Sequence, residues 1–255
     1  LICASTSKLR KALRLIDNWA SHNEMTYGVT KCGVMGVGVG AMEKVRAQSH
    51  RWKLDNQNIP VVESYVYLGL VFTSDLDLDK MVKARADKGR KVLSLIRPVL
   101  SCLDIPLTIR VNTLMKAILI PVLTYGGELW GMSNARVDPI QRILSMALKI
   151  MLRIKAKATI TSAAALGREF SIPPIIAISS AARTRAILKF PGLKTTITSL
   201  IANPIKTRRR TWVTNTRFWL RRFCSSVLRD NLHERDATKV VRQFAWERFN
   251  NRSGK

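Results

Sequence analysis

The sequence LTIRVNTLMKAILIPVLTYGGELWG (107–131) decides the fold class of this chain. Apolar residues dominate it over a length that suits a long helix and exceeds an ordinary strand. A transmembrane helix needs about 20 predominantly apolar residues, and here Lys116, Pro121 and Glu128 interrupt the run. We therefore expect a helix in a protein core and no membrane partner. Trp130 is expected to be a packing anchor and Glu128 a local hydrogen-bond partner.

Downstream of Asp75 the same helical spacing of apolar residues continues, and the strand pattern disappears. Prolines separate the periodic segments. The expected helices are Leu78–Ile96, Leu107–Trp130, Pro139–Arg153, Ala163–Glu169, Ile175–Leu188, Trp212–Leu228 and Asp236–Phe249.

Upstream, the chain has a mixed pattern. A helix is expected to begin at an N-cap formed by Ser7, because apolar residues then recur at steps of three and four. The expected strands are the glycine-interrupted run Cys32–Val39 and the short segments Trp52–Leu54, Ile59–Val62 and Tyr65–Phe72. The predicted fold class is therefore α+β, with a mixed segment 1–72, a helical segment 73–170 and a basic helical segment 171–255.

The charge balance narrows the choice of partner. The 255 residues are 47% hydrophobic, which is ordinary for a globular protein, but 43 Lys and Arg against 17 Asp and Glu leave a net charge of +26. From Pro139 to Arg229 we count 18 basic residues and one acidic residue, Glu169. Such an excess favours a polyanion, most commonly nucleic acid, although an acidic substrate or a membrane surface would use the same charge.

Several patterns of catalytic or metal sites are incomplete. Asp75, Asp77 and Asp79 begin like a calcium loop, but Lys80 stands where that loop needs glycine and Ala86 where it needs glutamate. Acidic residues at a helix N-terminus explain the cluster better. The three histidines are isolated, and the four cysteines lack metal-site spacing, which predicts reduced thiols in an intracellular protein. We find no complete active site.

A basic stretch, 208–222, alternates cations with aromatic residues, as in proteins that bind single strands by stacking and phosphate contact. On a helix, Trp212, Thr216, Trp219 and Phe223 share a face, which we expect to belong to the core. The arginines fall largely elsewhere and are expected to contact phosphates. They are Arg208, Arg209, Arg210, Arg217, Arg221 and Arg222.

Three short motifs remain, and their order and spacing are informative. GVTKC (28–32) follows an amphipathic helix, YVYLG (65–69) precedes a strand, and YGGELWG (125–131) ends the long apolar helix. Taken together, they resemble the rear part of the reverse transcriptase of non-LTR (LINE-type) retrotransposons. The resemblance covers most of 1–169.

The resemblance implies a specific organisation. Residues 1–72 would be a palm remnant with a primer-grip hairpin containing Tyr67, Leu68 and Gly69, where glycine permits close backbone approach. Residues 73–170 would be a helical thumb-like region, and 171–255 a basic helical extension. The parent transposable element would encode an RNA-directed DNA polymerase, a nucleotidyltransferase, acting on an RNA/DNA primer–template in the nucleus.

The resemblance also places the paired catalytic aspartates, which hold Mg²⁺ in the family, immediately before Leu1. We therefore expect Mg²⁺ in the intact parent, and neither a metal nor polymerase activity in this chain. Lys31 matches a lysine near the leaving pyrophosphate, where an ammonium could donate a proton; the alternative is an ordinary surface lysine. Two other interpretations of the chain stay open: a non-enzymatic basic helical protein that binds nucleic acid, and a degenerate transposon relic without function.

Overall fold

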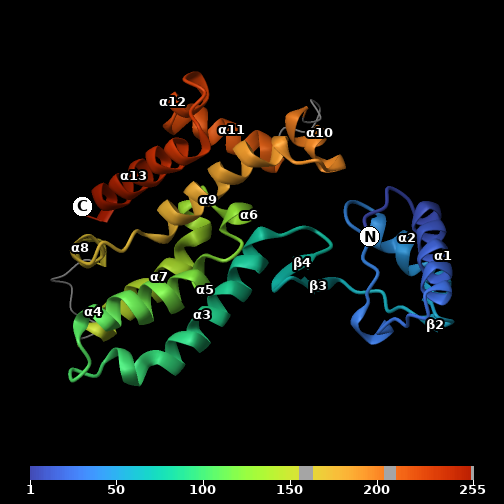
Figure 1. The fold of residues 1–255 in the computed structure, drawn as a ribbon, viewed down its shortest axis with the longest axis horizontal. Helices are drawn as coiled ribbons and strands as arrows, with labels where there is room; N and C mark the ends of the chain where they lie inside the picture. The colour runs from blue at the N-terminus through green and yellow to red at the C-terminus, as the bar shows by residue number, and fades with distance from the viewer. Residues whose placement is uncertain (155–162, 204–210, 254–255) are drawn as a thin grey trace. The chain divides into compact units, whose positions relative to one another are not determined.

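The structure is a computed structural model that describes residues 1–154, 163–203 and 211–253. These residues form two compact units, Leu1–Met81 and Val82–Lys255 (Figure 1). The described part of the chain is mainly helical, with two small antiparallel hairpins in the first unit. The predicted α+β class is confirmed at this level.

The first unit opens with helix α1 (Thr6–His22). Its N-cap is Ser5, whose hydroxyl accepts a hydrogen bond from the N–H of Lys8 at 3.3 Å. The prediction of Ser7 as the cap was wrong: Ser7 already lies in the first turn. Leu13 and Ala20 of α1 are buried, as the apolar spacing predicts.

The β-structure of this unit is smaller than the sequence suggests. Two hairpins form, and Cys32–Val39 contributes only an isolated bridge between Val34 and Val61. At Gly36 a Cβ would lie 2.4 Å from the carbonyl of Ala41, so this run folds tightly against the next helix and does not extend into a strand. The remaining elements are η1 (Val29–Lys31), α2 (Ala41–Arg46), η2 (Ser49–Arg51), β1 (Lys53–Leu54), β2 (Gln57–Asn58), β3 (Ser64–Tyr67) and β4 (Leu70–Thr73).

Trp52 lies at the centre of the first unit and is fully buried. Its indole N–H donates to the carbonyl of Val45 at 2.9 Å, which satisfies its polar atom inside the core. Leu13, Val29, Val34, Val45, Leu54 and Ile59 pack with it in one cluster.

Acidic residues arrange the start of helix α3 (Leu78–Leu100). The Asp77 carboxylate accepts the N–H of Asp79 at 2.8 Å, and Asp75 accepts the N–H of Asp77 at 3.2 Å. Lys80 donates to Asp75 at 2.8 Å, and this hydrogen bond holds the pKa of Asp75 well below its usual range. The cluster therefore caps a helix, as predicted, in place of forming a calcium loop.

The second unit is built from helices. The long apolar segment forms one helical run from Leu107 to Thr124, with a π-helical middle, and then breaks at Gly126. Pro121 supplies no N–H where the run returns to α-helix. The helices are α4 (Leu107–Ile109), η3 (Arg110–Leu119), α5 (Ile120–Thr124), α6 (Gly127–Trp130), α7 (Asn134–Met151), α8 (Ala163–Glu169), α9 (Ile175–Lys189), η4 (Phe190–Gly192), α10 (Thr196–Ala202), α11 (Trp212–Phe223), α12 (Ser226–Arg229) and α13 (Glu234–Ser253).

Several helix boundaries in this unit differ from those predicted. Helix α3 ends at Leu100 and not at Ile96, the predicted helix Leu107–Trp130 is interrupted after Thr124, and α13 spans Glu234–Ser253 and not Asp236–Phe249. Helix α7 begins at Asn134 because Ser133 caps it by accepting the N–H of Arg136 at 3.4 Å, which leaves Pro139 inside the helix. The expected helix Trp212–Leu228 is two helices, separated at Cys224. Helix α10 was not predicted.

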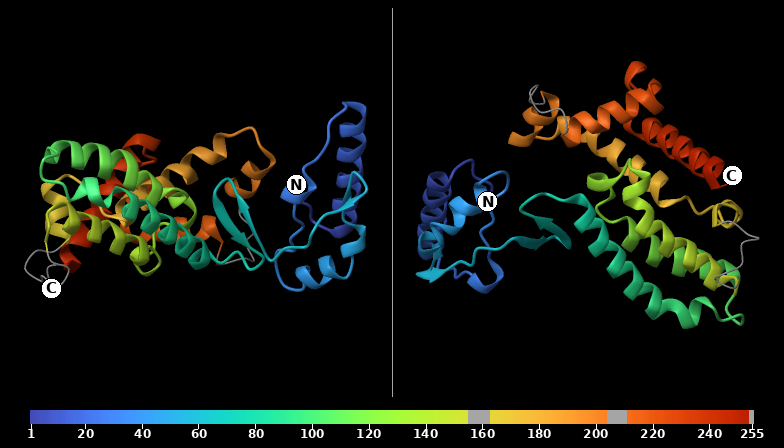
Figure 2. Two further views of the ribbon diagram at one scale, coloured as in Figure 1. Left: turned by 90° about the horizontal axis from the view of Figure 1, so that it is seen from below. Right: turned by 180° about the vertical axis from the view of Figure 1, so that it is seen from behind.

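Helix α9 is the centre of the second unit and packs against α6, α7, α11 and α13 (Figures 1 and 2). Small side chains on α9 allow this close packing, because they let neighbouring backbones approach. Those that are buried are Ala177, Ser179, Ser180, Ala181, Thr184 and Ala186.

The segment Leu107–Thr124 is the one helical run, within the ranges that the structure describes, that is long and apolar enough to cross a membrane. Core helices of soluble proteins meet the same criterion, and Met115, Leu119 and Leu123 of this run are fully buried against neighbouring residues. The absence of a membrane partner stays a prediction.

Candidate nucleic-acid interface

The hairpin β3–β4 presents the motif predicted as a primer grip. Tyr67 pairs with Leu70, so Leu68 and Gly69 form a two-residue turn with φ of +47° and +74°. Positive φ at both positions is typical of a type I′ turn, so the glycine is explained by backbone conformation and not by the close backbone approach expected from the sequence. Tyr67 is 60% exposed and Leu68 71% exposed, so the turn projects apolar surface into solvent.

The base of this hairpin is joined to the motif that contains Lys31. The hydroxyl of Tyr65 donates a hydrogen bond to the backbone carbonyl of Lys31. A Cβ at Gly33 would lie 2.9 Å from a methyl group of Val62, so glycine allows the two segments to approach. The structure thus brings the first two motifs together through the Tyr65 side chain, while the Lys31 side chain is exposed.

Side chains of the types that bind metal ions are not clustered in the part of the chain that the structure describes. In the ranges 1–154, 163–203 and 211–253, no three His, Cys, Asp or Glu side chains gather as ligands. Asp75 and Asp77, which begin the acidic cluster of the sequence, are engaged in helix capping. We therefore assign no catalytic step through Mg²⁺ to these residues.

The third motif, 125–131, is a packing element. Trp130 is fully buried. A Cβ at Gly131 would lie 2.5 Å from the carbonyl oxygen of Ser179 on α9, and one at Gly127 would lie 3.1 Å from the Cβ of Ser179. The two glycines therefore let α6 lie directly on α9, which confirms the structural role expected for Trp130.

A buried arginine that no sequence pattern singles out fastens this motif to α11. Arg183 of α9 is 4% exposed. Its guanidinium donates to the carbonyls of Leu129 (3.2 Å), Gly131 (2.9 Å) and Trp212 (3.0 Å) and to the hydroxyl of Thr216 (2.8 Å). Burial lowers the pKa of Arg183 to about 10.

A further hydrogen bond connects the segments that Arg183 joins, and we call these contacts together the Arg183 clamp. The indole N–H of Trp212 donates to the backbone carbonyl of Glu128 at 2.8 Å. Thr211 and Thr214 form a capping box at the start of α11, with backbone-to-hydroxyl distances of 2.9 and 3.1 Å. The N-terminal end of α11 is thereby held on α6 and α9.

Helix α11 has a buried face and a solvent-exposed face. Val213, Thr216 and Leu220 are buried, and Trp212, Trp219 and Phe223 pack beside the same core cluster, as predicted. Phe218 lies outside that stripe and is 63% exposed. The aromatic stripe was predicted correctly, but Phe218 was not assigned to the solvent face.

The arginines of the predicted phosphate-binding stretch differ in their surroundings. Arg221 and Arg222 are exposed, and the Arg222 guanidinium lies over the ring of Phe223 at 5.2 Å from its centroid. Arg217 is half-buried and donates to the carbonyl of Ile201 at 3.4 Å. Arg208, Arg209 and Arg210 lie outside the described residues.

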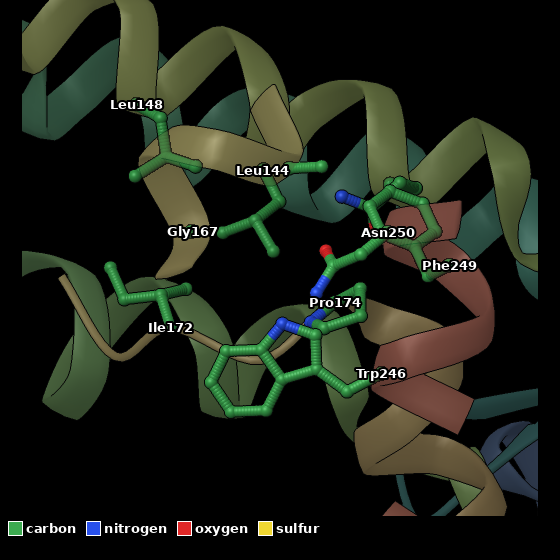
Figure 3. A pocket seen from close by; sticks show the side chains of 10 residues that line it. Leu144, Leu148, Gly167, Ile172, Pro174, Trp246, Phe249 and Asn250 are labelled. Atoms are coloured by element: carbon green, nitrogen blue, oxygen red, sulfur yellow. The ribbon is translucent and has the colours of Figure 1, made fainter. Parts of the chain in front are cut away.

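A hollow in the described part of the second unit is too small for a ligand. It lies between α7, α8 and α13, with Leu144 and Leu148 opposite Trp246 and Phe249 (Figure 3). Its volume of about 10 Å³ is near the lower limit for a single water molecule. This hollow therefore has no room for a nucleotide.

Comparison of the chain with known protein families, with curated proteins and with solved structures finds no match.

Proposed function

We propose that this chain is the C-terminal part of a LINE-type reverse transcriptase and that its role is to bind an RNA/DNA primer–template. In this proposal residues 1–72 are the palm remnant with the primer-grip hairpin, 73–170 the thumb-like region and 171–255 the basic extension. The observation that carries the nucleic-acid part is the basic solvent face of α11, where Arg221 and Arg222 are exposed and the helix has no acidic residue.

The positive charge of Arg221 and Arg222 supports phosphate binding, because α11 contains no acidic side chain that could pair with them. Elsewhere in the second unit, exposed basic residues such as Arg90 and Arg185 pair with Asp87 and Glu234. Exposed guanidinium groups that bind phosphates displace condensed counterions, so that affinity falls steeply with salt.

The hairpin supports the polymerase part of the proposal. An exposed turn made of Tyr67, Leu68 and Gly69 offers apolar surface and backbone groups to a strand of nucleic acid. Leu68 holds a positive φ that is unusual for a residue with a branched side chain. Strained positions of this type are frequent at ligand contacts, which motivates a functional test.

The test compares two nucleic acids of equal length in the presence of the full chain. One is an RNA/DNA heteroduplex with a recessed primer 3′ end, and the other is a flush-ended heteroduplex. We expect binding of both with a strong salt dependence, and tighter binding of the recessed end. Gly69→Val should remove the preference for the recessed end, because a β-branched residue at φ +74° costs about 1–2 kcal/mol and distorts the turn.

Asn56→Val is the matched control. Asn56 has φ +57° in the two-residue turn between β1 and β2 of the same unit, so the variant introduces the same strain at a different turn. If both variants retain the preference, or if wild type has none, the primer-grip assignment is refuted and the chain is better described as a non-enzymatic nucleic-acid-binding protein. If wild type binds neither duplex at low salt, the whole proposal fails.

A further inference from the structure

We infer that the solvent face of α11 is a stacking site for one unpaired base of a single-stranded nucleic acid, with Phe218 as the platform and Arg221 and Arg222 as phosphate contacts. The inference rests on the proposed function and deepens it, because it names the strand form that this surface recognises. It concerns a part of the second unit that the sequence resemblance barely covers.

The position of Phe218 follows from the helix geometry. Residues of an α-helix are spaced by about 100°, so Phe218 is turned by about 200° from both Thr216 and Leu220, which face the core. Val213, Thr216 and Leu220 form the buried stripe. The Phe218 side chain is consequently exposed to solvent, whereas the other aromatic residues of α11 pack beside the core.

The two arginines lie where a phosphate next to a stacked base would be. Positions three and four residues apart on a helix are neighbours, with about 5–6 Å between their Cβ atoms. Arg221 and Arg222 stand at those two positions relative to Phe218, and both are exposed. Contact of Arg222 with the Phe223 ring restricts its motion, which lowers the entropy cost of binding a phosphate.

The helix that carries these groups is firmly held. Arg183 and Trp212 fix its N-terminal end to α6 and α9, and Leu220 is buried near its C-terminal end. Trp219, Phe223 and Phe244 of α13 form an aromatic cluster with centroid separations of 5.3 to 6.2 Å. A binding face on such an element is preorganised.

A single strand is a better occupant than a duplex or a protein. An isolated aromatic ring on a convex helix can stack on an unpaired base, but the bases of a duplex are already stacked on one another. An acidic protein surface would be attracted by the arginines but has no requirement for the ring. The combination of an exposed ring with cations and no acidic residue on the helix therefore points to unpaired bases.

The experiment uses the full chain and two labelled oligonucleotides with the same number of phosphates, oligo-dT and the corresponding abasic strand. Phe218→Ala should weaken binding of oligo-dT about 5- to 150-fold, the range for removing one stacked base, and change binding of the abasic strand by less than about twofold. Phe218→Tyr, which keeps the ring, should retain binding. Phe218→Leu, which keeps apolar bulk, should resemble Phe218→Ala.

The arginine variants should behave differently. Arg221→Gln and Arg222→Gln should weaken binding of both strands and reduce the slope of log K against log salt by about 0.7 for each phosphate that is no longer neutralised. Trp19→Ala is the control for removal of an exposed aromatic residue, since Trp19 is 56% exposed on α1 in the other unit. It should leave both affinities unchanged.

The outcomes separate this inference from the proposed function. Steep, salt-dependent binding of wild type with no effect of Phe218→Ala refutes the stacking site and leaves the nucleic-acid function in place. An equal decrease in affinity for the oligo-dT and abasic strands also refutes stacking, because it means that Phe218 acts through structure or through the phosphates. No binding of either strand at low salt overturns both. Thermal unfolding of each variant checks that the fold is retained.

Discussion

Replacement of Arg183 by methionine tests whether the buried guanidinium holds the core of the helical unit together. Arg183 joins α9 to the carbonyls of Leu129 and Gly131 and to both Trp212 and Thr216 at the start of α11. Methionine keeps most of the length of the side chain but donates no hydrogen bond. Three backbone carbonyls would therefore be left without this donor inside the protein.

The expected cost follows from these hydrogen bonds. A buried polar group without its partner costs about 1–3 kcal/mol. Part of this is offset, because the variant no longer has to dehydrate a cation, a penalty visible in the lowered pKa of Arg183. We expect a net decrease of about 3 kcal/mol in the free energy of unfolding. In a unit of this size that corresponds to a decrease in Tm of roughly 6–12 °C.

The assay is thermal and urea unfolding followed by tryptophan fluorescence, since Trp130 and Trp212 lie in the segments that Arg183 contacts. Arg185→Met is the matched control: Arg185 is two residues away on the same helix, is exposed, and makes an ion pair with Glu234. That variant should be destabilised by less than about 1 kcal/mol. If Arg183→Met lies within roughly 0.5 kcal/mol of the control, the clamp does not stabilise the unit.

Three further predictions concern single positions or the whole chain. Gly131→Ala should destabilise the second unit by about 1–3 kcal/mol, because its Cβ would meet the carbonyl of Ser179, whereas Gly192→Ala, in open space, should be neutral by urea unfolding. Cys224 is buried and its pKa is raised to about 11, so iodoacetamide at about pH 8 should label it only after unfolding. Its contribution to stability is present below about pH 9 and disappears as the pH rises towards 11, because only the unfolded thiol ionises in that window. The chain alone should not extend a primed RNA template with Mg²⁺, and extension above a no-protein control would contradict the proposed position of this chain in the polymerase.

The helices were predictable because their apolar spacing is a local property. Helix α8 has the predicted bounds, and α9 extends one residue beyond them. Helix starts were less predictable, since Ser5 and Ser7 are chemically equal caps and the sequence around them does not distinguish the two. Among the predicted strands, the glycine-rich run Cys32–Val39 was wrong for a different reason. Its bridge joins Val34 to Val61 and its Gly36 lies against the backbone of Ala41, and the sequence of the run itself reveals neither contact.

The positive charge of the candidate interface was predictable from the sequence, but the arrangement of its side chains was less so. The positions of Trp212, Trp219 and Phe223 in the core follow from helical periodicity, and the same periodicity places Phe218 on the opposite face. Arg183 has no comparable signal. The carbonyls that bind it come from residues about 30 to 50 positions away, and only the small residues around it on α9 indicate that an unusual side chain could be buried there.

The number of basic residues in the sequence is larger than the number of cations that can contact phosphate. Arg85, Arg110 and Arg183 are buried, and backbone carbonyls accept hydrogen bonds from Arg110 and Arg183, while Arg85 lies over the ring of Tyr125. Carbonyls satisfy a guanidinium without neutralising it, so these arginines still contribute to the positive field that attracts a polyanion. They cannot release counterions by direct contact, so the salt slope reports only exposed cations such as Arg221 and Arg222. Buried arginines thus contribute to the attraction of a polyanion, whereas exposed arginines contact its phosphates. Arg183→Met separates the two effects, because this variant loses one positive charge and some stability but no phosphate contact.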